Sequence, residues 1–230
     1  FVLHLGGGAT KDMAGFLAST LYRGIGFISF PTTVLSQADA GIALKQGVNG
    51  TDGKNLLGSY YAPEKIIVDP SVLASLPERF VSDGLAECIK QAFAYDASFY
   101  KMFDEYKGDM KNLDFLEAVV RRAITLKVDS IEQDLHEDKI ALVNQYGHEF
   151  GHAVEHLSGY YYGHGESVGL GMRISAELSH ILGITTKDVV DKHIAMLKKY
   201  KLPYKIPENI SPEDIIYSLR FNKKYYSGEP

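Results

Sequence analysis

The chain has 230 residues, of which 45% are hydrophobic, and a formal net charge of −5. This length suits one large or two small domains, no apolar run reaches the roughly 18 residues of a membrane span, and no basic stripe indicates a nucleic-acid surface. We therefore expect neither a membrane nor a nucleic acid as a partner. The single cysteine, Cys88, excludes an internal disulfide and is typical of a reducing, cytoplasmic setting.

The first third of the chain reads as α/β. Short apolar runs at 1–5 and 25–30 flank an amphipathic stretch at 9–24, which predicts a βαβ unit and a parallel sheet. Residues 42–61 alternate in polarity around Gly–Thr–Asp–Gly and predict a hairpin, and residues 65–69 predict a further strand.

After Pro77 the pattern becomes helical. We expect the first of these helices at 83–96, with Ser82 or Asp83 as its cap. The other expected helices cover 114–134, 138–157, 166–182, 186–200 and 212–221. An α/β part, 1–76, is thus expected to precede an all-α part, 77–230.

Three glycines, at 6–8, stand between the first strand and the first helix. Backbone N–H groups in such a turn can approach an anion closely, and the helix N-terminus favours negative charge, so the turn is a candidate phosphate site. A triple glycine is less specific than a complete dinucleotide fingerprint, and a tight strand-to-helix turn explains it equally well.

Four of the eight histidines fall within residues 146–166: His148, His152, His156 and His164. His148 and His152 are spaced i, i+4 and share one helix face, so they can chelate a divalent metal, with His164 completing the set and a carboxylate in the remaining position. Spacing alone leaves open which three bind, and some of these residues could instead be core or surface histidines.

Charged residues in unusual settings are further candidates. Glu87 and Lys90 share a face of a largely apolar helix, which favours a site over a routine surface ion pair. Lys45, Lys54 and Asn55 lie among glycines, as suits a phosphorylated or polyhydroxylated ligand, although a solvated hairpin tip has the same composition.

Taken together, these stretches resemble the sugar phosphate cyclases, the superfamily of 3-dehydroquinate synthase and 2-deoxy-scyllo-inosose synthase. The matching segments run from residue 6 to about 172 and include GGGATKDMAGFLAST, FPTTVLSQADAG, LPERFVSDGLAECIK, YGHEFGHAVEH and HGESVGLGM. The resemblance implies a dehydroquinate-synthase-like fold with a partial NAD-binding domain at 1–76 and a helical metal- and substrate-binding domain at 77–230. The opening βαβ region of that fold, which would hold the adenosine half of a dinucleotide, is expected upstream of Phe1.

The resemblance also implies cofactors and residue roles. It implies NAD and zinc or cobalt, with Glu87, His148 and His164 as metal ligands and His152 facing substrate phosphate. The NAD site would include Gly7, Gly8, Asp12, Thr32, Thr33, Asp39 and Lys54. The substrate, a small sugar phosphate, would meet Lys45, Lys54, Asn55, Lys90, Lys127, Gln145, His152 and one of Lys223 and Lys224. Arg23 would reach the phosphate in a neighbouring subunit, which implies a homodimer.

The implied reaction oxidises a ring hydroxyl, eliminates phosphate, returns the hydride and closes a carbocycle by an intramolecular aldol step. Dehydroquinate synthases typically have an Arg and an Asn seven and three residues before the first ligand histidine, where this chain has Ala141 and Gln145. Because Ala cannot pair a carboxylate as Arg does, we favour a carboxylate-free sugar phosphate, as in 2-deoxy-scyllo-inosose synthase, although that enzyme usually has Glu at position 145.

Three alternatives remain open. The first is 3-dehydroquinate synthase with altered carboxylate recognition. The second is a metal-dependent alcohol dehydrogenase of the glycerol type, against which the hairpin lysines and Lys90 argue. The third is a non-catalytic relative, against which the complete metal and lysine set argues.

Overall fold

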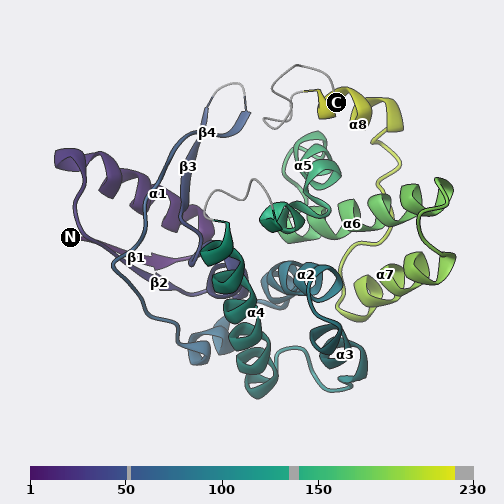
Figure 1. The fold of residues 1–230 in the computed structure, drawn as a ribbon, viewed down its shortest axis with the longest axis horizontal. Helices are drawn as coiled ribbons and strands as arrows, with labels where there is room; N and C mark the ends of the chain where they lie inside the picture. Colours follow the sequence, from purple (N-terminus) through teal and green to yellow (C-terminus); the bar gives the residue numbers. More distant parts are fainter. Residues whose placement is uncertain (51–52, 135–139, 221–230) are drawn as a thin grey trace. The chain divides into compact units, whose positions relative to one another are not determined.

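The computed structural model describes residues 1–50, 53–134 and 140–220 and contains two compact units (Figure 1). The first unit comprises residues 1–84 and 108–135, and the second comprises 85–107 and 136–230. Packing therefore divides the chain differently from the expected boundary after residue 76, because a later helix, 113–133, packs against turns of the N-terminal part. That boundary between functional domains stays a prediction.

The first unit holds the predicted βαβ unit. Strands β1 (Val2–Gly6) and β2 (Phe27–Pro31) pair in parallel, and α1 (Gly8–Thr20) connects them through a short turn, η1 (Leu21–Arg23). Strand β5 (Lys65–Ile66) extends the sheet in the order β1-β2-β5, but it is shorter than the strand predicted at 65–69. The unit also contains a turn of π-helix η2 (Ser36–Ala40), a 3-10 segment η3 (Pro70–Ser75) and the helix α4 (Leu113–Gln133).

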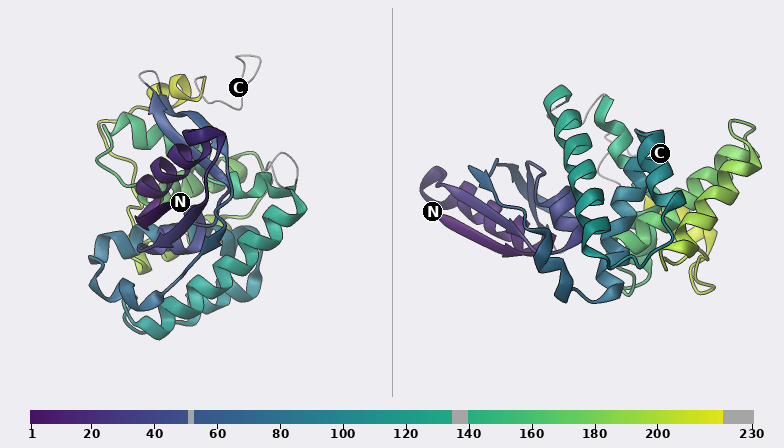
Figure 2. Two further views of the ribbon diagram at one scale, coloured as in Figure 1. Left: turned by 90° about the vertical axis from the view of Figure 1, so that its left-hand side faces the viewer. Right: turned by 90° about the horizontal axis from the view of Figure 1, so that it is seen from below.

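The predicted hairpin is present as β3 (Lys45–Gly50) and β4 (Gly53–Tyr60), with Lys45 opposite Tyr60. Thr51 and Asp52 of its Gly–Thr–Asp–Gly tip lie outside the described residues. Helix α1 packs directly on β3, and Figure 2 shows it among the strands of this unit. Gly15 permits that approach, since a Cβ there would lie 2.2 Å from Oε1 of Gln46.

The second unit is helical. Its elements are the C-terminal part of α2 (Glu78–Ala94), α3 (Ala97–Glu105), the 3-10 segment η4 (Ile140–Gln145), α5 (His148–Leu157), α6 (His164–Ile181), α7 (Lys187–Lys199) and α8 (Pro212–Leu219). An apolar cluster from α5, α6, α8 and the loop before α8 forms a core between them, with Val154 and Leu170 fully buried. Among the described residues, no helix is both long and apolar enough to cross a bilayer.

Two predicted helix starts are wrong. Helix α2 begins at Glu78, because the carbonyl of Pro77 already accepts hydrogen bonds from the N–H groups of Phe80 and Val81. Ser82 and Asp83, expected as caps, are therefore buried inside the helix. The helix predicted from 138 begins only at His148, because Gly147 has a left-handed backbone with φ of 77°.

Candidate metal centre and cofactor-binding turn

The second unit brings Glu87, His148 and His164 together from α2, α5 and α6. Oε1 of Glu87 lies 3.4 Å from Nε2 of His148 and 3.3 Å from Nε2 of His164. Glu87 is fully buried, and its Oε1 makes no hydrogen bond among the described residues. A buried carboxylate oxygen that faces two imidazole nitrogens without a hydrogen bond is costly unless another group satisfies it.

These separations fit a tetrahedral zinc site. Bond lengths of about 2.0–2.2 Å to nitrogen and oxygen place neighbouring ligand atoms about 3.4 Å apart at the corners of a tetrahedron. The two Glu87–histidine distances, 3.4 and 3.3 Å, have this value. The residues therefore fit a divalent metal held by one carboxylate and two imidazoles.

Lys90, one turn along α2, holds the second oxygen of the same carboxylate. Its Nζ donates to Oε2 of Glu87, and both side chains are buried. Burial alone would raise the pKa of Glu87, but the Lys90 ammonium and the His148 and His164 imidazoles hold that pKa well below its ordinary value. Glu87 is thus an anion whose Oε1 is directed at the histidines.

The other ring nitrogen of each histidine meets a hydrogen-bond acceptor. Nδ1 of His148 lies 3.3 Å from the carbonyl oxygen of Tyr146, and Nδ1 of His164 lies 3.2 Å from Oε2 of the buried Glu155. Each Nδ1 therefore carries the proton, which leaves the Nε2 lone pair for a metal. Burial, reinforced by Lys90, holds the pKa of His148 well below 6.5, so this imidazole is neutral as a ligand must be.

His152 belongs to the same cluster. The ligand atoms of His148, His152 and His164 all lie within 4.8 Å of one another, and the ring of His152 is 5.7 Å from that of His164. Two ligand sets are therefore possible, one completed by His152 and one by Glu87. The Glu87 set includes two separations of tetrahedral length and an oxygen that makes no hydrogen bond among the described residues.

Glycines on α5 and α6 explain why the two ligand helices meet here. A Cβ at Gly171 would lie 1.9 Å from the carbonyl oxygen of Gly147 and 2.6 Å from the nitrogen of Gly151. The two backbones can touch only because these positions lack side chains. His148 directly follows Gly147 at this crossing and begins α5, and His164 begins α6.

The glycine turn of the first unit follows the carboxyl end of β1. Gly7 occupies the cap position of α1, where no side chain accepts a hydrogen bond from the helix N-terminus. Thr33 lies beside Gly7 and Ala40 beside Gly8, each 3.3 Å from where a Cβ would stand. An uncapped helix start at the carboxyl ends of parallel strands suits a dinucleotide phosphate, so the turn fits that group.

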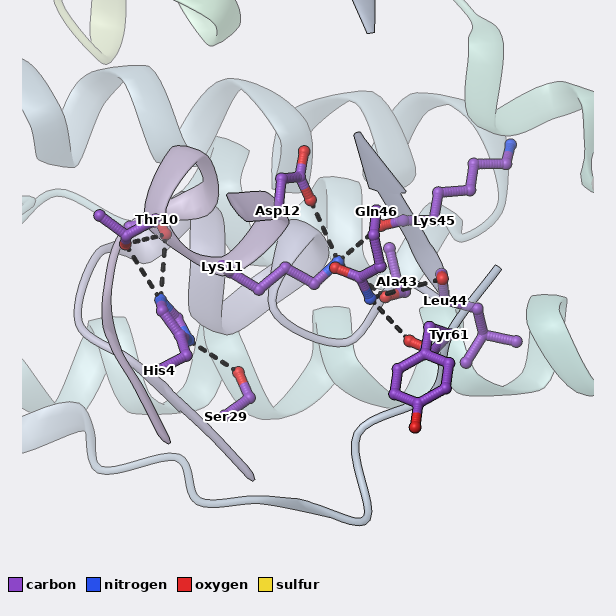
Figure 3. Close-up of polar contacts among 11 residues, drawn as sticks. His4, Thr10, Lys11, Asp12, Ser29, Ala43, Leu44, Lys45, Gln46 and Tyr61 are labelled. Atoms are coloured by element: carbon purple, nitrogen blue, oxygen red, sulfur yellow. Dashed lines mark hydrogen bonds and ion pairs between the residues drawn. The ribbon is translucent and has the colours of Figure 1, made fainter. Parts of the chain in front are cut away.

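A buried histidine braces this turn (Figure 3). Nδ1 of His4 lies 3.0 Å from Oγ of Ser29, and Nε2 lies 3.2 Å from both the Gly7 carbonyl oxygen and Oγ1 of Thr10. Thr10 in turn donates to the Gly7 carbonyl. Burial lowers the pKa of His4, so a neutral imidazole joins β1, β2 and the turn.

Two charged residues expected around substrate and cofactor form an ion pair within the first unit, since Nζ of Lys127 on α4 lies 2.9 Å from Oδ1 of Asp39. Asp12, also expected at the cofactor, instead meets Lys11, a residue that was not predicted, whose Nζ lies 3.3 Å from its Oδ1. Lys127, expected at the substrate, is thus beside Asp39, expected at NAD. Thr32 joins this region through its N–H, which donates to the Gly6 carbonyl.

For the remaining predicted residues the structure gives the backbone conformation or the exposure, or does not describe them. Asn55 is exposed with a left-handed backbone, Arg23 ends the strained turn η1 with φ of 67°, and Gln145 is half-buried at the end of η4. The backbone of Lys54 lies in β4, but its side chain, like that of Ala141, is outside the described set. Lys223 and Lys224 lie outside the described residues altogether.

Sequence reasoning missed Glu155, Tyr146, His4 and Lys11. Glu155 carried a signal, since it stands at i+7 from His148 and so lies two turns along the same helix face. Lys11 and His4 carried none, because the two carbonyls that bind Lys11 and the Ser29 hydroxyl beside His4 come from segments far away in sequence.

Comparison with known proteins gives the same relationship by sequence and by structure. A 3-dehydroquinate synthase of Synechocystis sp. is 38% identical over 99% of this chain, which spans 64% of that relative's length. A solved 2-epi-5-epi-valiolone synthase from Streptomyces hygroscopicus subsp. jinggangensis, with NAD⁺ and Zn²⁺ bound, superposes with a TM-score of 0.91 at 29% identity, over 98% of this chain and 64% of that one. A solved 2-deoxy-scyllo-inosose synthase, complexed with carbaglucose-6-phosphate, NAD⁺ and Co²⁺, superposes with a TM-score of 0.84 at 30% identity, over 94% of this chain and 60% of that one.

Two family models cover nearly the whole chain. The 3-dehydroquinate synthase N-terminal model matches residues 1–83, and the 3-dehydroquinate synthase C-terminal model matches residues 84–225. The fold inferred from the sequence is thereby confirmed, as is the resemblance to sugar phosphate cyclases: the chain belongs to the 3-dehydroquinate synthase family.

Proposed function

We propose that this protein is an NAD- and metal-dependent sugar phosphate cyclase that eliminates phosphate and closes a carbocycle. The observation that carries the proposal is Oε1 of Glu87, a fully buried carboxylate oxygen placed 3.3–3.4 Å from two imidazole nitrogens whose opposite sides are held by acceptors. The relatives named 3-dehydroquinate synthase and the solved cyclases with NAD⁺ and Zn²⁺ or Co²⁺ support the same reaction class.

The metal would be zinc or cobalt, with Glu87, His148 and His164 as its protein ligands. Three protein ligands leave a fourth position open, as in catalytic rather than structural sites. His152 is then left for the substrate, because its ring lies beside those of His148 and His164 without being needed to complete the set.

The NAD phosphates would lie at the glycine turn, against the N–H groups that begin α1, with Gly7, Gly8, Thr32, Thr33, Asp12 and Asp39 around the cofactor. Figure 3 shows the Asp12 carboxylate on α1 directed at the ammonium of Lys11. When bound, NAD⁺ would accept a hydride from the carbon that bears the reacting hydroxyl and later return it, and the metal would stabilise negative charge on the oxygen of that hydroxyl.

The side chains of this protein would bind and orient the sugar phosphate. Lys45, Lys54, Asn55 and His152 supply cationic and hydrogen-bonding groups for phosphate and hydroxyl oxygens, and Lys127 would add a charge held in place by Asp39. Lys90 fixes Glu87 through its ammonium, so its part in the site includes orienting a ligand. The departing phosphate can itself accept the proton that is removed, so no strong protein base is required.

We further propose that the substrate is a sugar phosphate without a carboxylate. Ala141 and Gln145 occupy the positions at which dehydroquinate synthases typically hold that group, and Ala offers no charge to an anion. The alternative is 3-dehydroquinate synthase activity, which the names of the curated relatives favour. A cytoplasmic homodimer, with Arg23 contributed to a neighbouring site, belongs to the same proposal.

Phosphate release measured with glucose 6-phosphate and with 3-deoxy-arabino-heptulosonate 7-phosphate, each with NAD⁺ and Zn²⁺ or Co²⁺, tests both levels of the proposal. We expect release from glucose 6-phosphate without accumulation of NADH. Release from the heptulosonate alone would favour the alternative substrate. Accumulation of NADH without phosphate release would indicate a simple dehydrogenase and contradict the cyclase.

A further inference from the structure

Lys11 is a fully buried cation to which the sequence gives no role. Its side chain on α1 has no exposed surface, and its Nζ lies 2.7 Å from the carbonyl oxygen of Lys45, 2.9 Å from that of Ala43 and 3.3 Å from Oδ1 of Asp12. An ammonium has three N–H donors and no acceptor, so these three oxygens use its full capacity. Burial lowers the pKa of Lys11, while the Asp12 carboxylate favours the charged form.

The two carbonyls that Lys11 binds lie on one edge of the chain entering β3. Carbonyls alternate in direction along an extended strand, and that of Leu44, between them, accepts from the N–H of Tyr61 on the β4 side. One ammonium therefore satisfies two successive carbonyls on the outer edge of the hairpin. A neutral, apolar side chain at position 11 would leave both without their donor.

These bonds fix two side chains proposed for the site. Figure 3 shows the Lys45 side chain extending away from Lys11, although its own carbonyl is bound by it. Asp12 follows Lys11 on α1 and shares the same ammonium. Lys11 thus fixes the position of the Lys45 backbone relative to α1. This helix carries Asp12 and follows the glycine turn.

Attachment of the hairpin to α1 does not depend on Lys11 alone. Oγ of Ser59 on β4 donates to Oγ of Ser19 on α1 at 2.8 Å, and Gln46 packs against Gly15. A buried charge is a costly way to add one more packing contact, because burial of an ammonium is compensated only by complete pairing. What the ammonium adds to the packing is the exact placement of the peptide at Lys45.

We propose that Lys11 is a positioning residue, which holds Lys45 in register for the sugar phosphate without touching that ligand. The inference rests on the proposed function, because it takes Lys45 as a substrate-binding residue. Lys45→Ala removes the side chain that Lys11 is proposed to position. The effects of the two substitutions on kcat/KM and on phosphate affinity should therefore not be independent.

The test is a double-substitution cycle in the full chain with NAD⁺ and Zn²⁺. Lys11→Met should lower kcat/KM for the sugar phosphate by about 100-fold, as expected for a misplaced binding group, and should weaken binding of inorganic phosphate measured by calorimetry. In the Lys45→Ala background, Lys11→Met should cause little further loss in either quantity. Ser19→Ala, which removes another contact between α1 and the hairpin, is the matched control and should leave kcat/KM unchanged.

Lys11→Arg provides a second variant that keeps the charge and donors if Lys11→Met does not fold. It should displace the β3 carbonyls and show the same dependence on Lys45. Multiplicative losses from Lys11 and Lys45 substitutions, or an equal loss in Ser19→Ala, would overturn the positioning role while phosphate release by the unaltered protein stands. Absence of release and of phosphate binding in the unaltered protein would overturn the proposed function, and the inference with it.

Discussion

The two units each bury a charged side chain, and they treat it in opposite ways. In the first unit, Lys11 has an acceptor for each of its three protons. In the second unit, Glu87 has Lys90 on one oxygen, whereas the other oxygen faces two imidazole nitrogens and makes no hydrogen bond within the described part of the chain. The difference separates a group that organises the backbone from one that is prepared for a ligand.

The contrast is informative because both arrangements are expensive. Removing an ion from water costs several kcal/mol, and native proteins recover most of this by pairing every donor and acceptor. Because every N–H of Lys11 is paired, substitution of Lys11 should lower the free energy of unfolding and displace the residues that it binds. Incomplete pairing at Glu87 means that a divalent ion should supply the missing partner.

The largest expected effect is that of Glu87→Gln on stabilisation by Zn²⁺. In the unaltered protein, Zn²⁺ at a thousandfold excess over its dissociation constant should add about 4 kcal/mol to the free energy of unfolding. That increment should vanish in Glu87→Gln, which lacks the anionic ligand, and persist in Lys11→Met, which should lose about 2–5 kcal/mol of stability by leaving two carbonyls unpaired.

Denaturant titration with and without Zn²⁺ measures the increment, and elemental analysis measures the bound metal. Because Glu87→Gln also leaves Lys90 buried without its partner, the zinc increment is the informative quantity, not the absolute stability. Full zinc occupancy in Glu87→Gln would show that His152 completes the ligand set instead.

Glu155→Ala should have an intermediate effect. Without the carboxylate, Nδ1 of His164 loses the acceptor that orients its ring, so Zn²⁺ affinity should fall about 10–100-fold. Glu155→Gln, which keeps an acceptor oxygen, should recover part of that loss. Competition with a chromophoric chelator gives the affinities, and Glu105→Ala, an exposed residue of the same unit, is the control. Equal affinities in all four proteins would mean that Glu155 does not orient the ligand.

Buried histidines away from the metal centre should show the smallest effect, on pH dependence. His4 and His193 have lowered pKa values because of burial, and both ring nitrogens of each have hydrogen-bond partners. Below pH 6.5 the unfolded chain takes up protons that the folded chain does not, so the stability of the metal-free protein should fall as pH drops, by at most about 1.4 kcal/mol per pH unit for each histidine.

Denaturation midpoints at pH 8, 6.5 and 5 measure this slope. His193→Asn should flatten it, and His156→Asn, at an exposed position of α5, should leave it unchanged. A slope that His193→Asn does not alter would show that burial of this imidazole does not govern acid stability.

Much of the fold follows from the sequence. The βαβ unit, the hairpin and the long helices have regular apolar periods, which local patterns reveal. The break before α5 could not be predicted, because a glycine inside a helical pattern is usually tolerated and nothing local shows that Gly147 adopts a left-handed backbone. The start of α2 at Glu78 differs from the prediction because Ser82 and Asp83 are residue types that usually cap a helix, whereas here they lie inside it.

The site was predictable where residue types carry their own chemistry. Four histidines close together and a Glu–Lys pair on an apolar helix indicated the metal region, and the family resemblance selected among them. The contacts that orient the site residues could not be predicted from the sequence. They depend on a backbone carbonyl such as that of Tyr146, or on segments far apart in sequence such as α1 and the start of β3.

The start of α5 and the start of α6 converge on the two imidazoles, which occupy the first position of each helix. Both positive dipole ends therefore lie near a proposed cation, which opposes its retention, and the Glu87, Glu155 and Glu166 carboxylates offset that repulsion. A dication in such surroundings draws oxyanions strongly. The two helix N-termini therefore lower the affinity for the metal ion. They also make the electrostatic potential more positive where a phosphate ester would bind.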